Sequence, residues 1–546
     1  MRSKTSKIAL FVFGLFLINF IGNKIYKRFD LTEDHRYTLS ETTKNIAKKV
    51  DDVILIKVYL QGNFPAEFKR LQTETQLHLE ELKFINKNIQ YRFIDPTDIN
   101  EELIDSGLEP SSLQVQENGK LSEMVLFPWA VINYKNKTEK VSLLNDVVSN
   151  SQDEQLESSI QNLEYAFANA IHKITASKSK KIAVLKGNGE LSDIYLADFL
   201  RKLNEYYLLA QYTLDSVETQ PQKTLFELSN FDLAIIAKPT EKFSEQEKFV
   251  LDQFIMNGGK TLFLIDNVQA ELDSLQQTGE ALAYPRDLGL TDFFFNYGVR
   301  INSDLVTDLY CSQIPLATGN IGNQTQFSQF PWVFNPLAIS KNNHPINTNI
   351  EAVNFKFTSN IDTLKNNIKK TILLQSSPLS KIIGTPSIVS LKTINTAPIK
   401  EEYNNGNQPL AVLLEGPFKS AYNGRVKPFK TLKPIENGLE NKMIVIADGD
   451  IIANEIAKGQ PLELGVDKWT YQRYGNKDFL LNSVNYLLDD TGLLSIRSKK
   501  IKINFLDKQK AFEESKKWQF INIAFPLIIL TLFGGIFYYF RFKKYQ

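Results

Sequence analysis

The 546-residue chain is poor in the residues that carry redox, metal and nucleophilic chemistry. Cys311 is the only cysteine, which excludes an intrachain disulfide and any site built from several cysteines. The 4 histidines are widely spaced and form neither an HExxH motif nor another close ligand pair. Basic and acidic residues nearly cancel, at 63 against 62, so the chain lacks the basic excess of a nucleic-acid-binding protein. We therefore expect no metal site, no cofactor and no nucleic-acid partner.

Nucleotide-binding motifs are also missing. Gly259-Lys260-Thr261 resembles the tail of a P-loop, but Phe254 stands where the first glycine of that motif is required. The segment also leads from a helix into a strand, which is the wrong direction for holding phosphate on a helix N-terminus. Gly187-Asn188-Gly189 follows a strand and opens a helix, but Ser192 replaces the third glycine of a dinucleotide fingerprint. We interpret it as a glycine turn, with an anion site as the alternative, and expect no ATP hydrolysis.

Long apolar runs are confined to the two ends of the chain. Trp518 to Phe540 carries no charge, and a helix of that length rises about 34 Å, enough to cross a hydrocarbon core of about 30 Å. Ile8 to Tyr26 is shorter, but Lys24 within it can snorkel, and no small-x-small cleavage site follows. We expect uncleaved membrane anchors in residues 1–28 and 518–546. The flanking basic residues are balanced, so they do not decide the orientation.

Residues 29–178 are expected to form the first soluble domain. Strands are predicted at 53–60, 90–95, 125–134 and 138–144, with helices at 64–84, 100–105 and 154–174. This order of elements is typical of a thioredoxin-like fold. The loop at 61–65, where such a fold carries its CxxC motif, has no cysteine, so we expect a binding or spacer module.

Residues 179–495 are expected to form a larger α/β domain. Near-continuous apolar strands, such as 181–186, 231–237, 261–266 and 443–447, alternate with helices. This pattern predicts an open parallel sheet covered on both faces, of the glutamine-amidotransferase or flavodoxin kind. A long insertion at about 270–440 is rich in polar residues and looks irregular. Residues 496–517 should form a juxtamembrane stalk, with a strand or extended segment at 495–505.

Candidate site residues follow from the sheet. The crevice at the carboxyl ends of parallel strands is the usual binding place in such folds. Turn formation and helix capping are the alternative role for Asp266, Asp448 and Asp450, and a metal or sugar site is a further one. Cys311 lacks a strand-elbow-helix context and is expected to be a packed thiol, so we predict no catalytic residue. The candidate ligand or partner crevice comprises Gly187, Asn188, Gly189, Glu190, Asp266 and Asp448.

A second candidate surface lies on the carboxyl-terminal span. Gly534 and Gly535 beside Thr531 form one face of small residues. Small residues let the backbones of two membrane helices approach closely. We expect this face to dock a permease helix.

Several short motifs together resemble the GldG family, the gliding-motility-associated ABC transporter auxiliary proteins. The resemblance covers nearly the whole chain. One departure is Asn188, which stands where the family pattern Gly-His-Gly-Glu has its histidine. The motifs are Arg28-Phe29-Asp30-Leu31-Thr32, Tyr37-Thr38-Leu39-Ser40, Gly187-Asn188-Gly189-Glu190, Phe243-Ser244-Glu245-Gln246-Glu247, Gly258-Gly259-Lys260, Tyr297-Gly298-Val299-Arg300-Ile301-Asn302, Asn482-Ser483-Val484-Asn485-Tyr486-Leu487-Leu488 and Leu494-Ser495-Ile496-Arg497-Ser498.

The resemblance implies a non-enzymatic auxiliary subunit of an ABC transporter in a bacterial inner membrane. Its partners would be the lipid bilayer, a permease and, through the permease, a cytoplasmic ATPase. It implies a role in gliding motility with a link to type IX secretion, a periplasmic main body and two cytoplasmic termini. The alternative is a membrane-anchored periplasmic ligand-binding receptor, or an amidotransferase-like hydrolase, that uses the sheet crevice.

Overall fold

A computed structural model describes residues 11, 13–14, 38–62, 64–117, 120–144, 152–176, 178–275, 278–322, 324–340, 342–431, 434–498, 510 and 513–545. The chain forms two compact units, Met1–Lys499 and Lys500–Gln546, which we call the main unit and the C-terminal unit. The predicted first span, Ile8 to Tyr26, lies outside the described residues apart from Phe11, Phe13 and Gly14. The predicted domain boundaries stay predictions.

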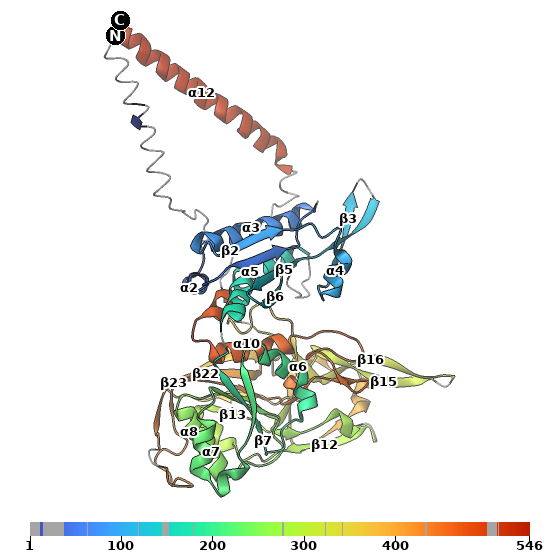
Figure 1. The fold of residues 1–546 in the computed structure, drawn as a ribbon. Coiled ribbons are helices and arrows are strands. Elements are labelled where there is room, and N and C mark those ends of the chain that lie inside the picture. Colours follow the sequence, from blue (N-terminus) through green and yellow to red (C-terminus); the bar gives the residue numbers. More distant parts are fainter. Residues whose placement is uncertain are drawn as a thin grey trace. The chain divides into compact units, whose positions relative to one another are not determined.

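The amino-terminal part of the main unit is built on a four-stranded sheet (Figure 1). Its order is β2-β1-β5-β6, in which β1 and β2 are parallel and the other neighbours antiparallel. Ile54 and Ile56 are buried and Leu55 less so, because successive side chains of a strand point to opposite faces. The elements are α2 (Glu41–Lys48), β1 (Ile54–Val58), α3 (Ala66–Ile85), β2 (Ile89–Phe93), α4 (Asn100–Asp105), β3 (Ser111–Glu117), β4 (Lys120–Leu126), β5 (Trp129–Tyr134), β6 (Lys137–Ser142) and α5 (Gln152–Thr175).

One expected strand of this part is divided in two. We predicted a strand from Val125 to Tyr134, but β4 ends at Leu126 and β5 begins at Trp129. Pro128 lies between them and has no N–H with which to continue the ladder. β4 pairs instead with β3 in an antiparallel hairpin that the sequence did not predict.

A seven-stranded sheet forms the centre of the larger part, in the order β19-β22-β23-β10-β9-β7-β8. The strands from β8 to β23 are parallel, as expected. The expectation of a wholly parallel sheet is wrong, because β22, near one edge, runs antiparallel to both of its neighbours, β23 and β19. A buried strand is apolar on both faces in either direction, so its composition does not reveal this. The strands are β7 (Lys181–Lys186), β8 (Leu208–Thr213), β9 (Leu233–Ala237), β10 (Lys260–Leu264), β19 (Lys369–Gln375), β22 (Pro409–Lys419) and β23 (Asn437–Ile446).

Helices cover both faces of this sheet. On one face α8 and α9 pack on Ala183 and Leu185, and on the other α6 and α10 pack on Ile182 and Val184. The predicted capping box is present, since Ser244 accepts from the Glu247 N–H and Glu247 accepts from the Ser244 N–H. The helices are α6 (Asp193–Asn204), α7 (Pro221–Leu228), α8 (Glu245–Met256), α9 (Thr291–Tyr297) and α10 (Asn476–Leu488), with short 3₁₀ helices η1 (Asp215–Glu218) and η5 (Asp450–Ile452).

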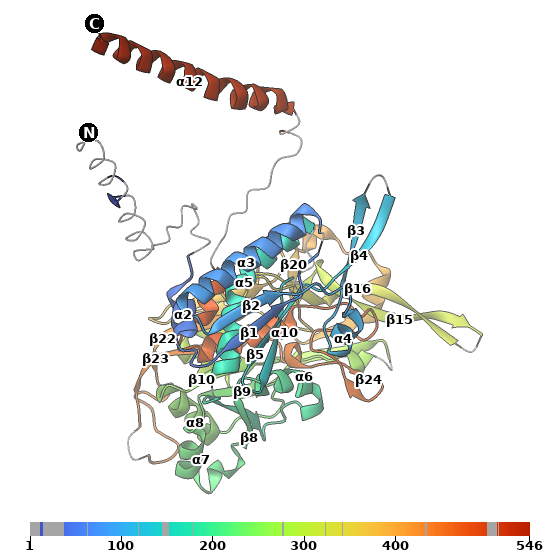
Figure 2. The ribbon, with the colours of Figure 1, turned by 45° about the horizontal axis from the view of Figure 1, so that its top comes forward.

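The insertion at about 270–440 contains more strand than expected. Its longest pair, β15 and β16, forms a hairpin that extends from the rest of the main unit (Figures 1 and 2). Trp332 of β16 is fully buried and packs beside Phe334, so this strand also belongs to a core. The remaining elements are β11 (Val268–Gln269), η2 (Leu272–Leu275), β12 (Glu280–Pro285), β13 (Val299–Ile301), β14 (Asp304–Asp308), β15 (Cys311–Ile321), β16 (Gln324–Ala338), β17 (Val353–Asn354), β18 (Ile361–Thr363), β20 (Ser380–Gly384), β21 (Ser387–Ser390), η3 (Leu391–Asn395), η4 (Lys400–Glu402), β24 (Ile456–Ala457) and β25 (Gln460–Pro461).

The carboxyl-terminal segments differ partly from expectation. Ser495 to Ser498 belong to the 3₁₀ helix η6 (Leu493–Ser498) rather than to a strand or extended stalk, and residues 499–509 lie outside the described residues. The C-terminal unit contains α12 (Ser515–Tyr545), which extends the predicted span at both ends. Ser515–Lys543 is the one described segment long and apolar enough to cross a membrane, and none of its most apolar stretch is buried.

Candidate functional site

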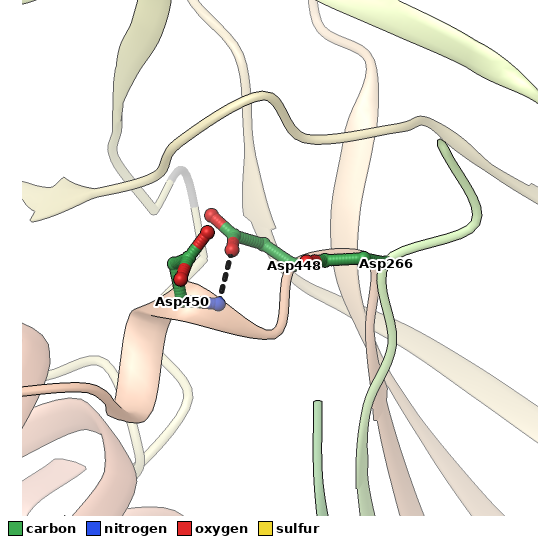
Figure 3. Close-up of side chains that lie close together, drawn as sticks. All are labelled: Asp266, Asp448 and Asp450. Atoms are coloured by element: carbon green, nitrogen blue, oxygen red, sulfur yellow. Dashed lines mark hydrogen bonds between the residues drawn. The ribbon is translucent and has the colours of Figure 1, made fainter. Parts of the chain in front are cut away.

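A charged cluster lies where three parallel strands end. Lys238 directly follows β9, Asp266 comes two residues after β10, and Asp448 comes two residues after β23. Because these neighbouring strands run in the same direction, their carboxyl ends meet at one edge of the sheet. Carboxylate oxygens of Asp266, Asp448 and Asp450 all lie within 4.8 Å of one another (Figure 3). Asp266 and Asp448, which we assigned to one candidate crevice, therefore lie close together.

Lys238 supplies the positive charge of this cluster. Its ammonium lies 2.6 Å from Asp450, 3.0 Å from Glu271 and 3.4 Å from Asp266. The side chain is only 6% exposed, so these ion pairs are largely removed from water. Its backbone is left-handed, with φ at +53°. The local fold thus holds one buried lysine among three carboxylates.

Two of the aspartates also bind backbone. Asp448 accepts hydrogen bonds of 2.6 Å from the N–H groups of Asp450 and Lys356, and Asp266 accepts one from the Gly449 N–H. A Cβ on Gly449 would lie 2.5 Å from the Cβ of Lys238. Glycine is therefore required at this close approach. The turn-forming role that we considered for these aspartates is part of what they do.

Burial shifts the pKa values of the charged groups in this cluster. Removal from water, together with the Asp450 carboxylate, raises the pKa of Asp266 to about 6. Burial and the neighbouring Asp266 and Asp450 carboxylates raise the pKa of Asp448 well above its usual value. Burial lowers the pKa of Lys238, but Asp450, Asp266 and Glu271 outweigh it, so the net shift is upward and Lys238 stays charged. The edge of the sheet thus combines a fixed ammonium with carboxyl groups that hold protons to higher pH than usual.

A cavity of about 410 Å³ opens beside this cluster. Lys238, Glu271 and Asp450 line it together with residues of the insertion, among them Asn335 of β16 and Lys356. The volume is within the range of small-molecule sites. The insertion therefore encloses the carboxyl edge of the sheet, where we expected it to contribute binding residues.

The predicted glycine turn does not join this cavity. The Asn188 carbonyl accepts hydrogen bonds of 2.9 Å from the N–H groups of Thr240 and Glu241, so the turn packs on the loop after β9. A Cβ on Gly189, whose φ is +72°, would lie 2.1 Å from Oγ1 of Thr240. The first residue after this turn that lines the cavity is Leu191. The structure thus brings Asp266 and Asp448 together, but the lining of the cavity includes neither these two aspartates nor the residues of the glycine turn, Gly187, Asn188, Gly189 and Glu190.

A match to a known protein family indicates the general function of this chain. Residues 179–483 match the family described as an ABC-type uncharacterized transport system. The chain belongs to this family. The match includes every strand of the seven-stranded sheet and all residues that line the cavity. Membership supports an auxiliary component of an ABC-type transport system, and α12 adds an indication of membrane association.

The chain also resembles other known proteins. Residues 33–133 match a domain of unknown function (DUF7088). A protein of Borreliella burgdorferi described as uncharacterized is 21% identical over 511 residues, which span 92% of this chain and 90% of that protein. The solved mmIFT52 N-terminal domain aligns over 57% of this chain and 99% of its own, with 13% identity and a TM-score of 0.33, too low to support a shared fold.

Cys311 has the properties of a packed thiol. It stands at the start of β15 and is partly buried. Burial raises the pKa of its thiol to about 11, so the thiol is protonated at neutral pH. A nucleophilic role would need the opposite shift.

The small-residue face of α12 is open within the C-terminal unit. Thr531 donates a hydrogen bond of 2.7 Å to the Leu527 carbonyl, which satisfies its hydroxyl within the helix. A Cβ on Gly534 or Gly535 would meet nothing within 4 Å. The spacing of these three residues places them on one helix face. This arrangement leaves room for a second helix.

Sequence reasoning missed Lys238, Glu271, Lys356 and Asn335. Asp266 was selected because it lies at the carboxyl end of a buried parallel strand. Lys238 also directly follows such a strand, but a lysine at a strand end usually contacts solvent. Asn335 was overlooked because its segment was expected to be irregular rather than part of β16. No sequence signal places Glu271 or Lys356 at the cavity.

Proposed function

We propose that the chain is a non-enzymatic auxiliary subunit of an ABC transporter in a bacterial inner membrane. The observation that carries this proposal is the family match, which covers more than half of the chain and concerns an ABC-type transport system. The apolar helix α12, with no buried residue in its most apolar stretch, supports a membrane anchor. The raised pKa of Cys311, the only thiol of the chain, supports the view that it performs no thiol chemistry.

The finer parts of this proposal come from the resemblance to the GldG proteins. In this view Ile8 to Tyr26 and α12 both span the membrane, the termini are cytoplasmic and the main unit is periplasmic. The partners are a permease and, through it, a cytoplasmic ATPase, and the process is gliding motility with its link to type IX secretion. The sheet order β2-β1-β5-β6 supports a thioredoxin-like spacer, and the parallel strands of the larger sheet support a flavodoxin-like or amidotransferase-like scaffold.

Co-purification is the direct test of the transporter role. The tagged full chain is extracted from its native membrane in a mild detergent, and its partners are identified by mass spectrometry. We expect an ABC permease and an ATPase in defined proportion to the chain. Recovery of the chain without any permease, under conditions that preserve another transporter of the same membrane, would contradict the proposal.

The orientation of the chain in the membrane can be tested separately. Protease added to intact spheroplasts reaches only what faces the periplasm. We expect residues 38–498 to be degraded from outside, while a tag at either terminus becomes accessible only after lysis. Protection of the main unit in intact spheroplasts would place it in the cytoplasm.

A second candidate function is a membrane-anchored ligand receptor, which the cavity of about 410 Å³ favours. An amidotransferase-like hydrolase is less supported, because Cys311 has a raised pKa. Alanine substitutions of Asp266 and Asp448 test the receptor. If the variants fold and motility is unchanged, the charged cluster that contains Asp266 and Asp448 has no receptor role in motility.

A further inference from the structure

One edge of the seven-stranded sheet is open. β8, labelled in Figure 2, is the last strand in the sheet order and pairs only with β7 among the described residues. The Leu208 N–H donates to the Lys180 carbonyl at 3.0 Å, and every second residue from Leu208 therefore bonds toward β7. The residues between them direct their N–H and C=O groups to the open edge, where no hydrogen bond to another described residue is present. These residues are Leu209, Gln211 and Thr213.

β8 lacks the features that normally keep an edge strand from pairing with another chain. Charged side chains, proline and bulges are the usual protection. At the opposite edge, β19 carries Lys369 and Lys370 and has two irregularities in its register. The edge strands of the four-stranded sheet also carry charges, among them Arg92 in β2 and Lys140 in β6. β8 instead has six uncharged residues in unbroken register, so a further strand can add to it.

The side chains of β8 match a second copy of β8 in one antiparallel register. When two such strands pair about Gln211, Leu209 of each copy lies opposite Thr213 of the other, and all outward backbone groups find partners. On the other face Ala210 lies opposite Tyr212, which places a small side chain against a large one. Ala210 is exposed and Tyr212 half-buried, so both can be reached from the edge.

Charges at the two ends of β8 favour the antiparallel direction. Before the strand, Lys178 is exposed, and its ammonium bonds to a backbone carbonyl but to no carboxylate of a described residue. Lys180 and Glu205 beside it are already paired within the chain. Beyond the strand, Asp215 and Glu218 of η1 are exposed and form no ion pair with a described residue. Antiparallel pairing brings the start of one strand beside the end of the other, so Lys178 of each copy approaches the free acids of the second.

We propose that β8 pairs with β8 of a second copy of this chain, so that the two sheets join about a two-fold axis at Gln211. Such a contact uses the same surface on both copies, as most dimers do. A strand of another protein could reach the same backbone groups, but the matches of Ala210 with Tyr212 and of Lys178 with Glu218 are built into this chain. The inference goes beyond the transport role and does not depend on it, because the edge belongs to the main unit.

Site-specific cross-linking in native membranes tests this pairing. In the full chain, Gln211→Cys places the thiols of two copies opposite each other, at a Cα separation of about 5.5 Å. A short bis-maleimide should therefore produce a covalent dimer. Two controls give the background, the unchanged chain, whose only thiol is Cys311, and Lys369→Cys at the opposite edge. Absence of a dimer with Gln211→Cys, or an equal yield with Lys369→Cys, would overturn the proposal. Cross-linking of Gln211→Cys to a different protein instead would assign the edge to that protein.

A charge exchange tests the register, with two differently tagged full chains produced in the same cells. Gln211→Lys in both copies puts like charges opposite each other and should lower the recovery of one copy with the other about fivefold. Lysine in one copy and glutamate in the other should restore recovery. Gln222→Lys in both copies is the matched control, because Gln222 is an exposed glutamine of α7 outside the edge.

Three results of this exchange would refute the pairing. Wild-type copies that are not recovered together, or recovery that Gln211→Lys leaves unchanged, would show that β8 does not join two copies. A loss that the glutamate copy does not restore would show that the copies do not meet at Gln211. Thermal unfolding of each variant verifies that it is folded.

Discussion

Lys238 is the residue on which the charged cluster depends most. Replacement by methionine keeps much of its volume but leaves Asp266, Asp450 and Glu271 without their shared ammonium. Loss of one partner from a buried ion pair typically costs about 3–5 kcal/mol, so we expect Lys238→Met to lower the free energy of unfolding by that amount. Urea unfolding of the full chain, followed by tryptophan fluorescence, measures it.

Lys242 provides the matched control for this substitution. It lies four residues further along the same loop, its side chain is 63% exposed and it pairs with Asp287 at 2.5 Å. Exposed ion pairs contribute little to stability, so Lys242→Met should unfold like the wild type. Equal losses in both variants would show that burial does not determine the importance of Lys238.

Asp266 should give the fold a measurable pH dependence. Its pKa is about 6 in the folded chain because of burial and Asp450, against an ordinary value of about 4 in the unfolded chain. The folded state therefore binds the extra proton, so this contribution to stability is fully present below pH 4 and is lost as the pH rises through about 6.

Asp266→Asn removes that titration and retains an oxygen that can accept from the Gly449 N–H. We expect the unfolding free energy of the wild type, relative to this variant, to fall by about 2 kcal/mol between pH 4 and pH 7. Urea unfolding at a series of pH values gives the difference. A difference that is constant with pH, or that rises, would mean that the pKa of Asp266 is not raised.

At the scale of single elements, the capping box of α8 offers a sharp comparison. The Ser244 hydroxyl accepts from the Glu247 N–H at 3.3 Å, and Glu247 accepts from the Ser244 N–H at 2.6 Å. Ser244→Ala should cost about 1 kcal/mol of stability. Ser192 occupies the same N-cap position of α6 but makes no capping bond through its side chain. Ser192→Ala should therefore have a smaller effect, and similar losses in the two variants would contradict the role of the box.

The strands also show which features of the fold could be predicted from the sequence. The run Leu233–Ala237 is buried throughout, and its continuous apolar character correctly predicted a central strand covered on both faces. The same reasoning assigned Asp266 and Asp448 to one candidate crevice, and their carboxylate oxygens lie within 4.8 Å of each other. It failed for the direction of β22, because pairing partners depend on contacts far apart in the chain. It failed for Asn335 because a buried polar residue in a strand resembles a loop residue until its neighbours are known.

At the scale of the whole molecule, the question is whether α12 only anchors the chain or also binds a partner. If the face formed by Thr531, Gly534 and Gly535 docks a permease helix, bulky side chains there will separate the two backbones. We expect Gly534→Leu and Gly535→Leu to reduce the permease recovered with the chain several-fold. Both variants should still reach the membrane fraction, because leucine favours insertion.

Phe533→Leu supplies the control for this face. At 3.6 residues per turn, Phe533 points well away from the three small residues, and its replacement keeps the helix apolar. Permease recovery with Phe533→Leu should match the wild type. If recovery also stays unchanged in both glycine variants while the wild-type complex is intact, α12 is a tether and the permease contacts lie elsewhere. If recovery falls in the glycine variants alone while all three variants reach the membrane fraction equally, the face is a docking surface.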